Sequence, residues 1–335
     1  MADSEQRRSP FSRRTFLQGS ALVLGGLAAG PHPQAAAQRA SRILRVGLIA
    51  DVHYADAPAR GSRHYRDSLS KLGEAVDTFN EAVEAFNAAG TDFVAVLGDH
   101  IDSDHGTEAN IGHLQAVEAV MEGLECPHYP VLGNHCLDGL TKEEFIANSV
   151  LEEPHYSFDT VGIRFVVVDC NYREDGEPYA AGNFDWTDTI IPEDQLQWLE
   201  AELAGTDGPA IVFSHQPLDD PGSHGVNNHE EVRAVLQDAG NVAAVFQAHN
   251  HSGAYQEING IHYCTQKAMV EGPAPDNNAY ALLDIHEDGF MRIQGFGRQD
   301  DRAFQSEVWP GLYEPPSEAL GTSAPFFQSP VGNTE

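Results

Sequence analysis

Acidic, amide and imidazole side chains follow five short apolar runs of this 335-residue chain, at 43–51, 93–99, 128–135, 210–215 and 243–249. These endings are Asp51 and His53, then Asp99, then Asn134 and His135, then His215, and finally His249 and His251. Residues i and i+2 of a strand share a face, so the last two imidazoles can point the same way. Because ligands bind at the carboxyl ends of strands in open α/β sheets, we expect these side chains to meet at one edge.

These residue types favour a metal site. Mixed carboxylate, imidazole and amide-oxygen ligands suit divalent Mn, Fe or Zn ions. The side chains outnumber the needs of one ion, which predicts two ions about 3.5–4 Å apart that share a carboxylate. Such a pair yields hydroxide from a bridging water and grips the oxygens of an in-line displacement at phosphorus. A nucleophilic serine would need an elbow such as Gly-x-Ser-x-Gly, and the sequence has none.

The elements that must position these side chains alternate along the chain. Apolar residues at three- and four-residue steps predict a helix within 65–90, and further helices are expected at 114–124, 192–205 and 229–240. Alternating strands and helices predict a largely parallel sheet covered by helices. Two hairpins, turning at Asn259-Gly260 and at 287–289, predict an antiparallel meander in the C-terminal part.

Composition narrows the partners. The net charge is −32 and there are only three lysines, so the surface repels nucleic acid polymers and anionic membranes. No window is apolar enough for a stable membrane span in the mature chain. The four cysteines match no zinc or redox spacing, and their pairing stays open.

The N-terminal residues 1–37 have the pattern of a Tat-type signal peptide. Arg13 and Arg14 precede a mildly apolar stretch that ends in small residues at 35–37. We therefore expect export by the Tat machinery to a periplasmic or extracellular location. One catalytic domain is expected at 38–303, followed by a tail rich in Pro, Ser and Gly at 304–335.

The motifs DVH, GDHID, GNH, SH and AHNH, in that order, resemble those of calcineurin-like metallophosphoesterases. The resemblance covers about residues 43–298 and implies a four-layer α/β/β/α sandwich. It implies that His135 does not bind metal but stabilises the transition state or protonates the leaving oxygen. It assigns Asp51, His53 and His251 to one ion, Asn134, His215 and His249 to the other, and Asp99 to both.

This chain departs from the family pattern beside the catalytic histidine and the bridging acid. Cys136 stands where Asp or Glu usually follows the histidine, and Ala248 replaces the glycine before His249. His100 occupies a variable position beside Asp99, where it is either a pocket residue or an exposed imidazole.

Segments 51–80, 195–204 and 252–263 look like the manganese-dependent ADP-ribose/CDP-alcohol diphosphatases. The resemblance implies a small phosphorylated, nucleotide-like substrate, although that subgroup often has Gln in place of His53. Candidate substrate contacts are His100, Arg66 and the loop aromatics Tyr179 and Trp186, which either stack on a base or pack the loop onto the domain. The alternatives are a phosphomonoesterase, a cyclic-nucleotide phosphodiesterase and, more remotely, a non-catalytic metal-binding protein.

Overall fold

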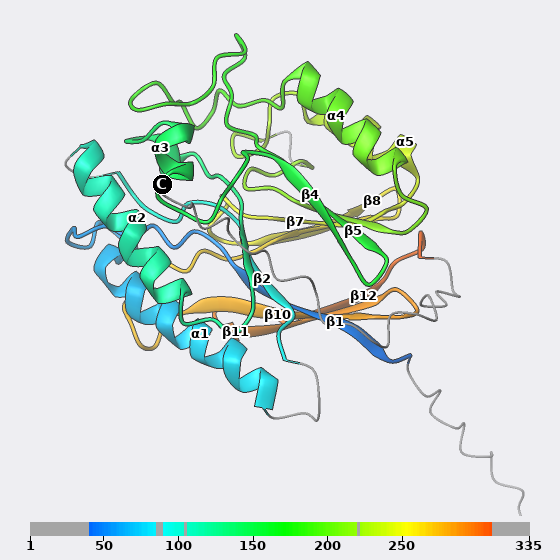
Figure 1. Ribbon diagram of the computed structural model, residues 1–335, viewed down its shortest axis with the longest axis horizontal. Coiled ribbons are helices and arrows are strands. Elements are labelled where there is room, and N and C mark those ends of the chain that lie inside the picture. Colours follow the sequence, from blue (N-terminus) through cyan, green and yellow to red (C-terminus); the bar gives the residue numbers. More distant parts are fainter. Residues whose placement is uncertain (1–39, 85–89, 104–105, 220–221, 310–335) are drawn as a thin grey trace, which may run out of the picture. The chain divides into compact units, whose positions relative to one another are not determined.

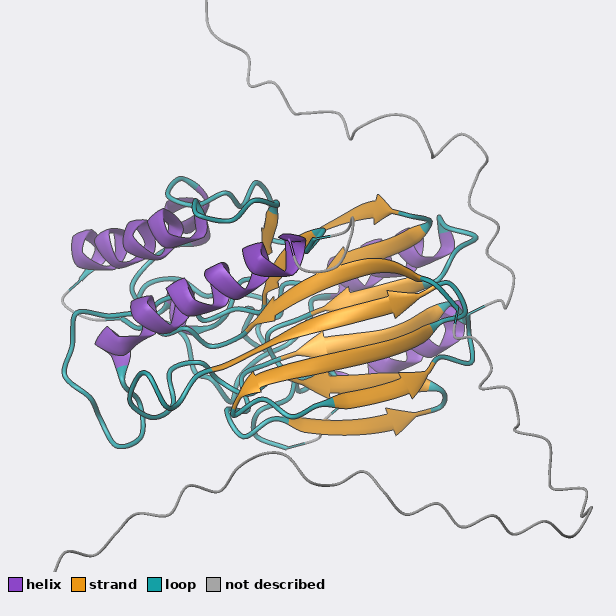
Figure 2. Ribbon diagram, turned by 90° about the horizontal axis from the view of Figure 1, so that it is seen from below, coloured by secondary structure: helices purple, strands orange, loops and turns teal. Residues whose placement is uncertain are grey.

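Two mixed β-sheets face each other in the computed structural model, which describes residues 40–84, 90–103, 106–219 and 222–309. In the described part, the first sheet has six strands, which lie side by side in Figure 2. Their spatial order is β12 (Arg302–Gln305), β11 (Phe290–Gly297), β10 (Ala279–His286), β1 (Arg42–Ile49), β2 (Phe93–Val96) and β3 (His128–Pro130). Strands β1 to β3 are parallel, and β10 joins β1 antiparallel.

The second sheet also has six strands among the described residues. Their order is β4 (Tyr156–Thr160), β5 (Ile163–Val167), β6 (Ala210–Phe213), β7 (Val242–Gln247), β9 (Ile261–Thr265) and β8 (Ala254–Ile258). The four strands from β5 to β9 in this order are parallel, and β4 and β8 are antiparallel edges. The carboxyl ends of these parallel strands therefore lie at a common edge.

Helices pack on the outer face of each sheet, over part of its width (Figure 1 and Figure 2). The first sheet carries α1 (Ser68–Glu84) and α2 (Thr107–Met121), with the short α3 (Lys142–Ile146) nearby, and the second carries α4 (Glu193–Ala204) and α5 (His229–Ala239). Strand residues alternate between the two sides: Phe93 faces the opposite sheet, whereas Val94 packs under the helices. This is the four-layer α/β/β/α sandwich that the resemblance implied.

The predicted hairpins form, but they do not make one meander. Strands β8 and β9 turn at Asn259-Gly260, and β10 and β11 turn at 287–289. The first hairpin extends the second sheet, while β10 and β11 belong to the first sheet. The prediction of a single antiparallel unit was wrong because the connection between β9 and β10 crosses from one sheet to the other.

The folded domain also extends beyond its predicted end at residue 303. Strand β12 pairs with β11, and Phe304 and Trp309 are buried in the core between the sheets. The predicted signal peptide at 1–37 and the tail beyond residue 309 lie outside the described residues. Within the described part, no helix is long and apolar enough to cross a membrane, and all four cysteines are unpaired.

Candidate metal centre

The predicted ligands lie where parallel strands of both sheets end. Asp51 and His53 follow β1, and Asp99 follows β2. From the other sheet, His215 follows β6, and the pair of His249 and His251 follows β7. Asn134 and His135 come from the loop after β3. The structure thus brings together every residue of the predicted metal set.

The backbone at this edge is strained. Asp51, His53, Asp99 and His249 have φ angles of 52°, 46°, 48° and 66°, in the left-handed region that non-glycine residues rarely adopt. Bonds between the loops hold this conformation: the His53 amide donates to the Asp99 carbonyl at 2.7 Å. Strain of this kind persists only where the surroundings enforce it, and it gathers at functional sites.

Two glycines let the ligand loops approach each other. A Cβ on Gly98 would lie 2.3 Å from Nδ1 of His215, and one on Gly133 would lie 2.2 Å from Oδ1 of Asp99. Any side chain at either position would displace a ligand. The glycines of the GD and GN motifs are therefore needed for close packing around the site.

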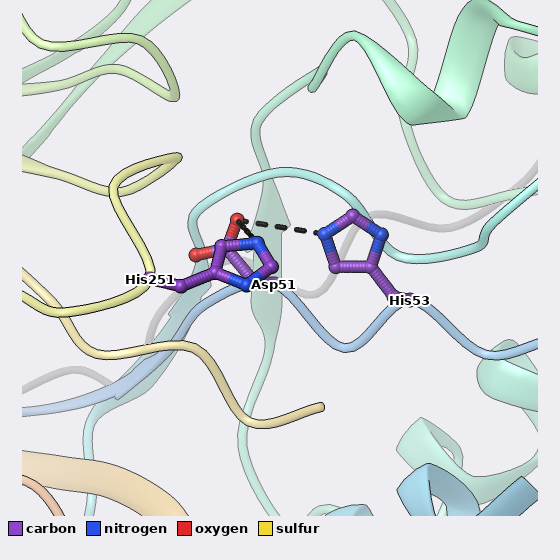
Figure 3. A group of neighbouring side chains, drawn as sticks. All are labelled: Asp51, His53 and His251. Carbon is purple, nitrogen blue, oxygen red and sulfur yellow. Dashed lines mark ion pairs between the residues drawn. The ribbon is translucent and has the colours of Figure 1, made fainter. Parts of the chain in front are cut away.

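Asp51, His53 and His251 form the first ligand group (Figure 3). Oδ1 of Asp51 lies 3.8 Å from Nε2 of His53 and 3.7 Å from Nε2 of His251. Both oxygens of Asp51 are buried without a hydrogen-bond partner among the described residues, as are both ring nitrogens of His53. Partnerless buried polar atoms are costly, and a cation would satisfy them.

Asp99, His215 and His249 form the second group, with Asn134 beside it. Nε2 of His215 lies 3.1 Å from Oδ1 of Asn134 and 3.2 Å from Nδ1 of His249. Oδ2 of Asp99 lies 3.1 Å from Nε2 of His215 and 3.3 Å from Nε2 of His53. One carboxylate oxygen thus stands between the two groups, as a bridging ligand must.

The charges suit divalent cations. Burial would raise the pKa of Asp99, but His215, His53 and His135 hold that pKa well below its ordinary value. Burial lowers the pKa of His249, helped by His215, so its imidazole is neutral and can offer a lone pair. Burial also opposes charge on His53, yet Asp99 and Asp102 raise its pKa to about 10. A metal ion would replace that proton. The residues therefore fit two divalent ions.

Carbonyl and carboxylate oxygens behind the site face four of the imidazoles. Nδ1 of His215 lies 2.8 Å from the Leu97 carbonyl, and Nδ1 of His251 lies 2.7 Å from Oε1 of Glu271. Asp102 faces two rings: its Oδ2 is 3.5 Å from Nδ1 of His53, and its Oδ1 is 3.4 Å from Nδ1 of His135. The hydrogen bonds to the Leu97 carbonyl and to Glu271 fix which nitrogen of His215 and His251 can face a metal. Asp102 was visible as part of a sequence motif but had no predicted role, and no local sequence pattern marked Glu271.

His100 does not line the cavity. Its side chain is buried, lies 3.5 Å from Sγ of Cys136 and packs against Phe145. Burial lowers the pKa of His100 to about 4 and raises that of Cys136 to about 12, so both are neutral. The suggested substrate contact of His100 was wrong, because its ring turns into the core behind Asp99.

A cavity of about 310 Å³ opens over the two ligand groups. Besides site residues it is lined by Arg63, Phe184, Trp186 and His224. Trp186, which was predicted to contact the substrate, lines this cavity. Its ring centroid is 6.1 Å from that of His249. Arg63 was missed, because one arginine in a loop carries no local signal.

Two other predicted contacts lie away from this cavity. Tyr179 is buried, and its hydroxyl donates to the carbonyls of Asp185 and Asp188, so it packs the loop. Arg66 is exposed and donates to Oδ1 of Asp56 at 2.6 Å. Both predictions failed because each side chain finds a partner within its own loop.

A four-layer sandwich with acidic, imidazole and amide ligands at its strand ends defines a metal-dependent phosphoesterase. The family model of calcineurin-like phosphoesterases matches residues 44–253, and the chain belongs to that family.

Similar proteins carry related names. The chain is 28% identical over 297 residues to the manganese-dependent ADP-ribose/CDP-alcohol diphosphatase of Oryza sativa, covering 74% of this chain and 89% of the rice protein. The Arabidopsis thaliana protein of the same name is 26% identical, with 78% and 96% covered. A crystal structure of a dimetal phosphatase from Danio rerio superposes with a TM-score of 0.68 at 24% identity, over 80% of this chain and all of that one. This last likeness concerns the fold.

Proposed function

We propose that the chain is an exported hydrolase of nucleotide diphosphate linkages that works with two divalent ions, preferably Mn²⁺. One observation carries this proposal: the cavity over the ligand groups also holds a cation, Arg63, and an aromatic wall that includes Phe184 and Trp186. In a nucleotide diphosphate, one phosphate would lie at the ligand groups, the second phosphate at Arg63 and the base against the aromatic side chains. The names of the rice and Arabidopsis relatives support the same substrate class.

The ligand groups would each hold one ion. Asp51, His53 and His251 form the first site, and Asn134, His215 and His249 form the second. Asp99, which lies between the two groups, would contribute to both sites. When bound, two divalent ions lower the pKa of a water and neutralise charge on phosphate oxygens.

The remaining residues bind and protonate the substrate. The His135 ring directs Nδ1 toward Asp102, which leaves Nε2 to donate a proton to the departing oxygen. Arg63 balances the charge of the second phosphate. Trp186, whose side chain is 42% exposed, offers a flat face to a base.

Product analysis tests this activity. The full-length chain, loaded with Mn²⁺, is incubated with ADP-ribose, and the formation of AMP is followed by chromatography. AMP release supports the diphosphatase assignment. If ADP-ribose survives while an aryl phosphate or a cyclic nucleotide is cleaved, the alternative activities replace it. A chain that binds metal but turns over none of these esters would be a binding protein.

Export is the second part of the proposal. The twin arginines at Arg13 and Arg14 and the small residues at 35–37 support it. Replacing both arginines with lysine is expected to keep the protein in the cytoplasm, as measured by fractionation. Equal distribution of the variant and the unchanged chain would argue against the Tat route.

A further inference from the structure

The connection between β9 and β10 crosses from one sheet to the other beside the first ligand group. It runs along the end of β1: the amides of Met269 and Val270 donate to the carbonyls of Ala50 and Asp51 at 3.0 and 3.1 Å. The amide of Ala268 donates to the carbonyl of His251 at 3.3 Å. This segment therefore contacts the backbone of two residues in that group.

Glu271 of the same segment holds the His251 imidazole. Oε1 lies 2.7 Å from Nδ1 of the ring, a full hydrogen bond. The opposite nitrogen, Nε2, faces Oδ1 of Asp51 at 3.7 Å. Figure 3 shows this ring turned toward Asp51. With Nδ1 engaged by a carboxylate, the proton stays on that side and Nε2 is free to bind a cation.

Lys71 binds the backbone of this segment, at residues 269–272. It stands on α1 and is one of the three lysines of the chain, yet its side chain is only 1% exposed. Its ammonium donates to the carbonyls of Met269, Glu271 and Gly272 at 2.9, 3.3 and 2.6 Å. Burying a lysine is costly, and the three carbonyls compensate for the lost water. The ammonium thus fixes the backbone on which Glu271 stands.

We propose that Lys71 and Glu271 are positioning residues that set the geometry of His251 in the first metal site. Lys71 locks residues 269–272, and Glu271 then orients the imidazole. This inference rests on the metal centre of the proposed function, but not on its substrate.

Metal titration without substrate tests it. The metal-free full-length chain is titrated with Mn²⁺ in competition with a fluorescent chelator, which resolves the two binding steps. His251→Ala serves as the reference that shows which step belongs to the first site. Glu271→Ala is expected to weaken that same step about 10–100-fold and to leave the other within about twofold. A chain that cleaves no diphosphate would still report both steps, so the two proposals fail separately.

Further variants separate orientation from general damage. Gln at position 271 still accepts from Nδ1 of His251, so Glu271→Gln is expected to recover most of the affinity. Lys71→Met is expected to weaken the same step by a smaller factor. If Glu271→Ala does not fold, Glu271→Asp draws the carboxylate back and is expected to weaken that step too.

The control is Glu200→Ala, an exposed acid on α4, which is expected to change neither step. The proposal is overturned if Glu271→Ala weakens both steps equally, changes neither, or weakens the step that His251→Ala leaves intact.

Discussion

The ligand cluster is buried at strand ends, whereas the outer wall of its cavity, which includes Phe184 and Trp186, belongs to a loop. Asp51 and Asp99 are buried at strand ends and have left-handed backbone angles. Trp186, on the wall, is 42% exposed and stands in the long loop between β5 and α4. The buried cluster sets the chemistry, because no ligand can move alone. On the proposed function, the wall sets the choice of substrate, because its side chains are not metal ligands themselves.

The sharpest test of the cluster is Asp99→Asn. One oxygen of Asp99 stands between His53 and His215, and a neutral amide cannot bridge two cations as a carboxylate does. We expect kcat/KM to fall at least about a thousandfold, which corresponds to about 4 kcal/mol of lost transition-state stabilisation. Metal analysis should find that the paired binding is lost as well. Full activity with a single bound ion would refute the bridging role.

His135→Ala tests the side chain where cluster and wall meet. General acid catalysis contributes about 10²–10⁴-fold, and most where the leaving group is poor. We expect a loss of at least about a hundredfold with an alkyl phosphate ester, whose alkoxide leaving group is a strong base, and a smaller loss with p-nitrophenyl esters, whose leaving group needs no proton. Equal losses with both substrates would assign His135 to charge stabilisation. The content of bound metal should stay unchanged.

The sequence predicted the cluster because its signal is local. Each apolar run marks a strand, and the residue type at its end is visible without any tertiary information. The order of the strands in the sheets is needed only to conclude that these strand ends lie close together. The glycines of the motifs were visible in the sequence, but the close packing that requires them was not. Gly133 is explained only when its backbone is seen beside Asp99.

The sequence could not predict the wall or the outer supports. Tyr179 and Trp186 belong to the same aromatic loop. The Tyr179 hydroxyl donates to a carbonyl inside the loop, whereas Trp186 lines the cavity. Glu271 reaches His251 because its segment crosses between the sheets. The prediction of a single antiparallel meander did not include that crossing. Pairing choices of this kind depend on distant contacts that no local pattern encodes.

Gly133→Ala probes how tightly the cluster is packed. The new Cβ would lie 2.2 Å from Oδ1 and 2.3 Å from the backbone nitrogen of Asp99. Overpacking of this kind lowers the free energy of unfolding by about 1–3 kcal/mol. Urea denaturation of the metal-free chain measures it, and Mn²⁺ affinity should fall in parallel.

The matched control is Gly112→Ala in α2, where a Cβ would meet nothing within 4 Å. Alanine is favoured over glycine in a helix, so this variant should be more stable by about 0.5–1 kcal/mol. If both variants gained stability, the cluster would be looser than its distances indicate.

Trp186→Ala should have the smallest effect, because it alters only the wall. Stacking of a base on an aromatic side chain contributes about 1–3 kcal/mol, so we expect KM for ADP-ribose to rise about tenfold or more. The value of kcat should change little, since the ring of Trp186, among the described residues, lies against one predicted ligand, His249, and against His224, which is not a predicted ligand. Trp186→Phe keeps a stacking face and should restore most of the affinity. An aryl phosphate that lacks a base should show no difference among the three proteins. If kcat fell instead, with KM unchanged, the wall would share in holding the ligands, and the division between chemistry and substrate choice would not hold.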